Sequence, residues 1–554
     1  MKKLLTVALC AFILVLAGCV ATQQTTGEDP PVQQDGLQNP EPLIPGVTAE
    51  LFPLSSQCIA CHNNIVTDGG AHYSFVEDWF NSIHGQSSVD PIYLAMVRRE
   101  TLVLPSAADE IQATCAACHL PVADMAAIAL GLSQSFLDNS SKTDHVLYEQ
   151  YRDGGSCMFC HQLTSVPTEG NTKFRTTSMS VNLHQSPAGE TRTLYGYHPS
   201  SVSAQQPMIN AIGYSTLPNF IERTELICTV CHTLYTDAFT VDGKPAGTRL
   251  PEQVISLEWM AWSDWSTHSC QSCHMPVNVP LGPLASYKTE DPTQGRIATH
   301  SFVGANSYLL KLVGSDGSLD KGIAATTEYL QSKTATLALK GSYSDASSSL
   351  LELDVLLTSL SGHKFPTGFP SRRAWLHVQV LDDSGAVLYE SGAYDSKGMI
   401  LDNNSDLDKS SFEPHYMVID QPGQVQIYEA IMMDSNGNPT TNLLQGVDYL
   451  KDNRVIPTGF NKFNLRGDTA VVGEAMDDED FIGARDTTFY KISLPAGTGN
   501  VTIKVELLYQ TVGYRFMEDL LSYPSAEQQA LAKLVEETPN LPVLITSQEI
   551  KVSR

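Results

Sequence analysis

The second half of the chain alternates between hydrophobic and polar positions. The alternation is clearest over residues 351–357, 376–380 and 501–509, and glycine, aspartate, asparagine and proline residues separate these runs. A period of two places every second side chain on the same face of a strand, so the pattern is typical of half-buried antiparallel strands. We therefore predict a β-rich domain over residues 326–554, most simply built as a β-sandwich. Residues 530–537 have the spacing of one short helix.

The first half, residues 51–325, lacks this alternation. Its long, irregular polar stretches are rich in Asn, Gly, Ser and Pro and predict short helices and loops with little sheet. In one clear helical pattern, Val76, Phe80 and Ile83 repeat at helical spacing, and His84 follows Phe80 by four residues on the same apolar face. A chain of 554 residues is too long for one compact core. The two textures together predict an α+β fold.

The N-terminus indicates export. Lys2 and Lys3 precede an apolar run over residues 4–16, which is too short to span a bilayer and has the length of a signal-peptide core. We expect residues 1–18 to be a removable signal peptide. No other segment of the sequence has the length and apolarity of a membrane span.

The residues that follow predict a lipid anchor on a spacer. The sequence LAGC at residues 16–19 resembles the lipobox of bacterial lipoproteins, in which the cysteine becomes lipidated. Residues 19–50 are rich in Gln, Pro, Gly and Thr and predict a flexible tether. By the same resemblance, Val20 favours transport to the outer membrane. We expect a protein of the cell envelope that is held to the membrane through lipidated Cys19.

The charge of the chain limits its partners. A formal net charge of -27 would be repelled by nucleic acid and by an anionic membrane surface. It favours basic or cationic partners, including a positively charged redox protein. Hydrophobic residues make up 42% and charged residues 17%, which is ordinary for a folded globular protein.

Ten of the twelve cysteines form five Cys-x-x-Cys-His motifs, and the other two are Cys10 and Cys19 near the N-terminus. The motifs, numbered in chain order, are motif 1 (Cys58, Cys61, His62), motif 2 (Cys115, Cys118, His119), motif 3 (Cys157, Cys160, His161), motif 4 (Cys228, Cys231, His232) and motif 5 (Cys270, Cys273, His274).

This spacing suits covalent haem attachment. Two thiols one helical turn apart can form thioethers to the two vinyl groups of a haem, and the adjacent imidazole can then bind the iron. Zinc ribbons pair two Cys-x-x-Cys knuckles without a histidine after each, and five knuckles would leave one unpaired. Iron–sulfur sites and disulfides also use paired cysteines, but five redox-type Cys-x-x-Cys disulfides in one chain would be unusual. We expect five haem c groups, with porphyrin forming much of the core of residues 51–325.

Ten of the fifteen histidines remain as ligands for the opposite side of each iron, and five would suffice. His84 is favoured by its apolar helical face. His300 precedes an apolar segment that Asn306 or Ser307 could cap as a helix.

Two further distal candidates have weaker local patterns. His145 lies at the start of a helical run toward motif 3. His198 and His184 share a loop-rich stretch, where His198 is preferred. His268 lies only two residues before Cys270, too near to serve the haem of motif 5.

The last candidate depends on a resemblance. The segment LTSLSGHKFPTGFPSRRAW presents His363 at the end of a predicted strand, and the phrases HSCQSCHMP and HSFVGANSYLL occur nearer the N-terminus. These phrases resemble a family of exported bacterial multihaem cytochromes, loosely related to cytochrome c-554 and to hydroxylamine-oxidoreductase-type multihaem proteins. The resemblance implies that the β-rich domain contributes His363 to a haem of the N-terminal part. His377, among apolar neighbours on a predicted strand, is expected to be structural, and His415 is left undecided.

Two acidic stretches complete the candidates. Asp402, Asn404, Asp406 and Asp408 place oxygens at alternate positions that could bind Ca²⁺, although the glycine and terminal glutamate of an EF-hand loop are missing. The run over residues 477–480 is interpreted as a solvated face.

The sequence thus predicts electron transfer through five haems toward a redox partner protein or an extracellular acceptor. Two histidines on each iron would close both axial positions to substrate. The alternative is a multihaem reductase or oxidase of a small nitrogen or sulfur compound, which needs one open haem with acid–base side chains above it. The Cys-x-x-Cys-Lys motif of many ammonia-forming nitrite reductases is absent from the sequence. A structural cytochrome that serves adhesion is a third possibility.

Overall fold

In the computed structural model, the described residues of the chain all belong to one unit, which extends to Arg554. The predicted signal peptide, Cys19 and the tether lie outside the described part of the chain, so their roles stay predictions. The described residues are 52–67, 69–164, 172–173, 180–181, 192–196, 202–218, 225–277, 283–286, 298–344, 349–463 and 467–554.

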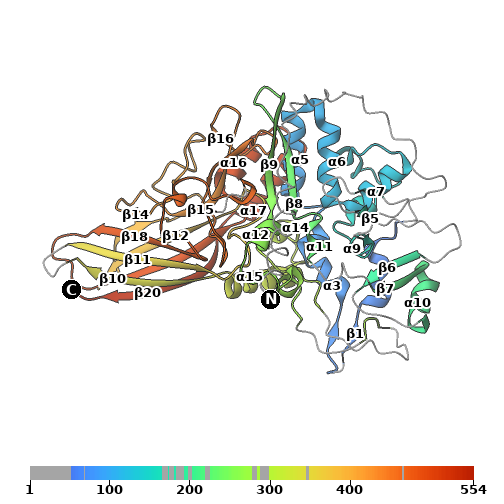
Figure 1. Cartoon of the computed structure of the whole chain (residues 1–554), viewed down its shortest axis with the longest axis horizontal. Coiled ribbons are helices and arrows are strands. Elements are labelled where there is room, and N and C mark those ends of the chain that lie inside the picture. The colour runs from blue at the N-terminus through green and yellow to red at the C-terminus, as the bar shows by residue number, and fades with distance from the viewer. Residues whose placement is uncertain are drawn as a thin grey trace, which may run out of the picture. The chain divides into compact units, whose positions relative to one another are not determined.

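Short helices dominate the first half, as expected, and Figure 1 shows α5, α6 and α7 on the side of the drawn unit opposite β10 and β20. The helices up to the last motif are η2 (Ser55–Cys58), α2 (Ile59–His62), α3 (Phe75–Phe80), α4 (Ile83–Gln86), α5 (Pro91–Val103), η3 (Pro105–Ala107), α6 (Ala108–His119), α7 (Pro121–Leu130), α8 (Phe136–Asn139), η4 (Gln150–Arg152), α9 (Cys157–Cys160), α10 (Val202–Ile212), α11 (Leu226–Thr229), α12 (Ile255–Met260) and α13 (Cys270–His274). They are followed by α14 (Ser307–Val313) and α15 (Asp320–Lys333). The predicted domain boundary at residues 325 and 326 falls inside α15.

The first half also contains more sheet than its sequence texture predicts. The main addition is an antiparallel hairpin of β8 (Thr233–Phe239) and β9 (Pro245–Val254). Its turn contains Asp242 and Gly243, and Gly243 has a φ of +79°, which glycine adopts without strain. Asp-Gly between two β-prone runs is typical of a hairpin turn. The prediction of loops from the composition of this half missed it. The smaller strands are β1 (Ile65–Val66), β2 (His72–Tyr73), β3 (Leu163–Thr164), β4 (Thr172–Lys173), β5 (Ser180–Val181), β6 (Arg192–Gly196) and β7 (Tyr214–Pro218).

The second half forms two sheets, and the α+β class is confirmed. One sheet has the order β10-β11-β18-β14, and the other β16-β15-β12-β19-β20, with β13 paired to β12 and β17 to β15. The strands are β10 (Ala335–Tyr343), β11 (Leu350–Ser359), β12 (Arg373–Asp382), β13 (Val387–Ser391), β14 (Val418–Ile419), β15 (Ile427–Met433), β16 (Pro439–Thr440), β17 (Asp448–Asp452), β18 (Arg485–Ser493), β19 (Val501–Gln510) and β20 (Val543–Val552).

The three runs of alternation lie in β11, β12 and β19, and their apolar side chains are buried. Leu353 of β11, Val378 of β12 and Val505 of β19 are fully buried in one hydrophobic cluster that the two sheets share. Burial of these side chains from both sheets is the main apolar stabilisation of this half. The predicted C-terminal helix is α17 (Ala526–Glu537), which follows α16 (Tyr514–Leu521).

The C-terminal helices join the two halves. On α17, the Gln528 side-chain amide donates to the Ala95 carbonyl of α5 at 2.7 Å, and Glu527 pairs with Arg98 at 2.9 Å. Leu444 of the second half is buried in the main apolar cluster of the first half. Figure 1 draws α12 and α15 between the sheets and the helices. None of the described helices is long and apolar enough to cross a membrane.

The predicted helix that carries His84 is broken into two. α3 ends at Phe80, which is 47% exposed, and α4 begins at Ile83. The Ser82 hydroxyl accepts the Gly85 N–H and starts the new helix. His84 therefore does not share a helical face with Phe80, and its side chain is half-buried.

Candidate cofactor-binding site

A large cavity lies among the five motifs. Its volume is about 2070 Å³, and nine of the ten motif cysteines and all five motif histidines line it. Pockets for a single drug-sized ligand usually enclose roughly 300 to 1,000 Å³. The cavity therefore has room for more than one large ligand. Three further histidines line it, and all three are predicted distal ligands: His84, His300 and His363.

Each motif lies at a short helix or at a helix end, which brings its two cysteines to one side. Motif 2 ends α6, and motifs 1, 3, 4 and 5 begin at or within α2, α9, α11 and α13. Serines before two motifs start these helices: Ser156 accepts the Phe159 N–H, and Ser269 accepts the Ser272 N–H. The serine in front of the motif thus caps the short helix and fixes where it begins.

Four motif histidines are oriented by backbone carbonyls. Each donates its Nδ1–H to a carbonyl oxygen, because a carbonyl can only accept. The nitrogen that remains, Nε2, keeps its lone pair and can bind a metal ion. The pairs are His62 with Leu284 at 2.9 Å, His119 with Ser87 at 3.3 Å, His161 with Tyr195 at 2.6 Å and His274 with Val303 at 2.5 Å.

Three of the motif histidines face a second imidazole across the cavity. With nitrogen–metal bonds of about 2 Å, two imidazoles on opposite sides of one ion have ring centroids about 6 Å apart. The observed centroid separations match this value. They are 6.4 Å for His161 and His300, 6.0 Å for His84 and His232, and 6.1 Å for His274 and His363.

Burial keeps five of the histidines that line the cavity neutral, as metal binding requires. Loss of solvation lowers the pKa of each ring far below the pH of a neutral solution. The pKa is lowered to about 4 for His84, His119 and His363, and to about 3 for His232 and His300.

The thiols approach one another between motifs but do not pair covalently. All ten described cysteines are free of disulfides. Thiols of different motifs lie within hydrogen-bonding reach in three places: Cys58 with Cys157, Cys118 with Cys231, and Cys228 with Cys270. Cys160 also lies close enough to Cys228 and Cys231 to raise the pKa of both thiols electrostatically, after larger contributions from their thiol partners and from burial.

Zinc sites and iron–sulfur clusters do not fit this arrangement. Tetrahedral zinc and Fe–S clusters need several thiolates or imidazoles around one point. Among the described residues, the motif cysteines and histidines form no group of three or more ligand atoms within 4.8 Å. Pairs of imidazoles with a thiol pair beside one of them fit haem c instead.

His363 reaches the cavity from the corner between β11 and β12. Its Nδ1–H donates to the Lys364 carbonyl at 2.9 Å. The preceding residue must be glycine, because a Cβ at Gly362 would lie 2.7 Å from the Trp262 ring. This requirement accounts for the Gly-His pair at the end of the strand.

A buried carboxylate on α12 holds that corner in place. Glu258 is fully buried and accepts hydrogen bonds from the Lys364 backbone N–H at 3.2 Å and from the Thr367 hydroxyl at 2.5 Å. Its other oxygen pairs with Arg454 at 3.0 Å. Asp452 in turn pairs with Lys364 and Arg454, at 2.7 Å in each case. No sequence pattern marks Glu258, since its partners lie more than 100 residues away.

The other histidines are placed elsewhere. His145 is half-buried and accepts the Leu147 N–H, and the cavity lining does not include it, so its assignment stays a prediction. His184 and His198 lie outside the described residues. His72 and His268 are exposed. His377 bonds two carboxylates on its sheet, Glu390 and Glu506, as a structural histidine would.

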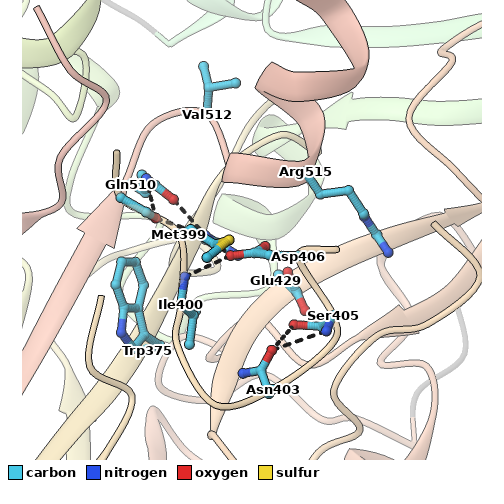
Figure 2. Close-up of polar contacts among 12 residues, drawn as sticks. Trp375, Met399, Ile400, Asn403, Ser405, Asp406, Glu429, Gln510, Val512 and Arg515 are labelled. Atoms are coloured by element: carbon cyan, nitrogen blue, oxygen red, sulfur yellow. Dashed lines mark hydrogen bonds and ion pairs between the residues drawn. The ribbon is translucent and has the colours of Figure 1, made fainter. Parts of the chain in front are cut away.

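The predicted calcium loop does not gather its oxygens. Both Asp406 oxygens are held by Arg373, at 2.6 and 2.9 Å. One of these oxygens also accepts the Ile400 N–H (Figure 2). Asp408 accepts from Ser410, and Asp402 is exposed. The expectation of Ca²⁺ is therefore wrong, because the guanidinium occupies the position that a cation would need.

His415, Asp478 and Asp486 form a buried cluster that has metal-ligand chemistry. The His415 Nε2 lies 3.0 Å from Asp478, and its Nδ1 faces the side-chain amide nitrogens of Gln426 and Asn453. Those nitrogens can only donate, so Nδ1 accepts their hydrogen bonds. Nε2 therefore carries the proton and donates a hydrogen bond to Asp478. His415 has no free lone pair for a metal. Asp478 is buried, so the interpretation of residues 477–480 as a solvated face fails for this residue.

Comparisons support the fold. The structure resembles the crystal structure of a penta-heme cytochrome c552 from Thermochromatium tepidum, with a TM-score of 0.51 and 18% sequence identity, over 91% of this chain and 99% of that chain. At this identity the likeness shows a shared fold. No protein-family model matches the sequence, and no curated protein matches it.

Proposed function

We propose that each of motifs 1 to 5 holds one haem c and that the protein transfers electrons through them. The observation that supports this most directly is the set of three imidazole pairs, each with one motif histidine and a centroid separation of 6.0 to 6.4 Å. When bound, haem supplies an iron that changes oxidation state, and two imidazoles on that iron leave no position for substrate.

In this proposal the thiol contacts set the order of the sites. Cys58 and Cys157 bring motif 1 beside motif 3, and Cys118 and Cys231 bring motif 2 beside motif 4. Motif 4 also meets motif 5 and lies near Cys160 of motif 3. We infer a route 1–3–4–5 with motif 2 branching from motif 4.

The open haem that the alternative reductase or oxidase requires would be held by motif 1 or motif 2. Within the described part of the chain, the ring contacts of His62 and His119 are with Phe75 and Tyr93 and not with a second imidazole. We propose that His198 or His184 supplies a ligand there, and that the protein works at the cell envelope, anchored through Cys19.

Three measurements test the proposal. The mass of the mature protein should exceed that of the lipidated polypeptide by five haem groups. Electron paramagnetic resonance of the ferric protein should show only low-spin haem, and the reduced protein should not bind carbon monoxide. A high-spin signal from one haem in five, with carbon monoxide binding, would favour the reductase or oxidase. A protein without added tetrapyrrole would refute both.

A further inference from the structure

The wall of the cavity carries few positive charges. Among the described residues, its lysine and arginine side chains are those of Arg249, Lys333 and Arg372. The Arg249 side chain is 59% exposed and pairs with Asp237 at 3.1 Å, and Lys333 is exposed at the end of α15. Arg372 is half-buried and forms no ion pair within the described part of the chain. Its charge therefore faces the cavity without a matching anion.

Both halves of the chain hold the Arg372 guanidinium in place. Its Nη2 donates to the Asn306 side-chain oxygen at 2.8 Å, and its Nη1 donates to the Thr367 carbonyl at 2.9 Å. It also packs against Gly368, where a Cβ would lie 3.3 Å from Nη1. A guanidinium has five N–H donors, so three have no acceptor among the described residues. Arginine keeps its proton in proteins, so the positive charge at this position is permanent.

Arg372 lies beside the imidazole pairs that contain the motif 4 and motif 5 histidines. Burial is the main cause of the lowered pKa of His232 and of His363, neighbouring imidazoles come next, and the Arg372 charge lowers the pKa of both further. The Cys228 and Cys270 thiols of the same two motifs lie within hydrogen-bonding reach of each other. The cation is therefore located where these two motifs meet.

We propose that Arg372 binds a haem propionate at the junction of motifs 4 and 5, an inference that rests on the proposed function. Propionates are carboxylates, and a guanidinium fork can donate two parallel hydrogen bonds to one carboxylate. A cation removed from water without an anion is costly, and a propionate supplies the missing negative charge.

This contact makes Arg372 a positioning residue for the haem. Through Thr367 and Asn306 it ties the edge of the porphyrin to both halves of the chain. The ferric haem carries one more positive charge than the ferrous haem, so a nearby cation disfavours the ferric state and raises the reduction potential.

Spectroelectrochemical titration of the full-length haem protein tests the proposal. Arg372→Gln should change the reduction equilibrium of at least one haem about tenfold, which lowers its potential by about 59 mV. Arg249→Gln is the matched control, because Arg249 lines the same cavity but already pairs with Asp237, and it should leave the potentials unchanged. Equal potentials in Arg372→Gln and Arg249→Gln would overturn the proposal.

Arg372→Lys separates the charge from a structural role. Lysine keeps the positive charge but not the fork that holds Asn306 and Thr367, so this variant should retain most of the wild-type potential. A loss as large as that in Arg372→Gln would show that Arg372 only supports the corner of the second half, and would overturn the proposal.

Two further measurements identify the anion and the cause of a failure. Added acetate should leave the wild-type potentials unchanged, whereas a shift with acetate concentration would show that Arg372 binds a free anion instead of a propionate. The mass of each preparation should include five haem groups. A protein without added tetrapyrrole would refute the proposed function itself, and five haems with unshifted potentials would refute only the role of Arg372.

Discussion

Replacement of Glu258 by glutamine tests how the second half of the chain holds His363 at the cavity. The carboxylate accepts from the Lys364 backbone and from Thr367, and it pairs with Arg454. Glutamine keeps the shape and can still accept one hydrogen bond, but it removes the negative charge. The perturbation therefore isolates the electrostatic part of the contact.

The magnitude follows from the charge balance of the buried network. Lys364 and Arg454 face Asp452 and Glu258, so two cations meet two anions. Glu258→Gln leaves two buried cations facing the single anion Asp452, and this uncompensated buried charge costs about 3 to 5 kcal/mol of unfolding free energy. For a chain of this size the melting temperature should fall by roughly 3 to 5 °C. The His363 corner should loosen, and part of the haem at motif 5 should become high-spin.

Thermal unfolding and electron paramagnetic resonance of the same preparation give the two readouts. Glu506→Gln is the control, because Glu506 pairs with His377 and Lys504 on the partly exposed face of its sheet. Its loss should cost less than about 1 kcal/mol. The reasoning is refuted if Glu258→Gln is as stable as Glu506→Gln and keeps every haem low-spin.

Two further predictions concern the cavity. His84→Ala, His300→Ala and His363→Ala should each convert one haem in five to a high-spin form that binds carbon monoxide when reduced, whereas a fully low-spin variant would remove that residue from the ligand set. Burial raises the pKa of Glu252 to about 7, so the folded state retains a proton that the unfolded state releases, and stability declines as pH rises from about 4.5 to 7. Glu252→Gln should consequently raise the unfolding free energy by up to about 3 kcal/mol near pH 8 and by less than about 1 kcal/mol near pH 5, as measured by denaturant titration; an equal effect at both pH values would contradict the assigned protonation.

The sequence was sufficient to predict those features that depend only on residues close together in the chain. The five motifs need only a fixed spacing along one helical turn, and the alternation in β11, β12 and β19 needs only that one face be buried. The same reasoning failed at Phe80, because Ser82 offered a cap that restarted the helix. It also failed at the β8–β9 hairpin, where a two-residue turn signal outweighed the loop-rich composition of its surroundings.

The pairing of ligands could not be derived in this way. His161 and His300 are 139 positions apart in the sequence, and His84 and His232 are 148 apart, so each contact depends on how the whole first half folds. Local context favoured His84 for its apolar neighbours and His300 for the helix that follows it, but it gave no partner for either. It also gave no sign of Glu258, whose importance depends on charges contributed by the other half.

The position of His363 argues that the β-rich half is part of the cofactor site. Its imidazole is presented by a corner whose strands are buried in the shared core of two sheets, and that corner is fixed to α12 by Glu258. A glycine at 362 allows Trp262 of the first half to pack against the same corner. Movement of the sheets would therefore move the His363 imidazole, the ligand that we propose for motif 5. The stability of the second half and the redox properties of that haem should be linked through these few contacts.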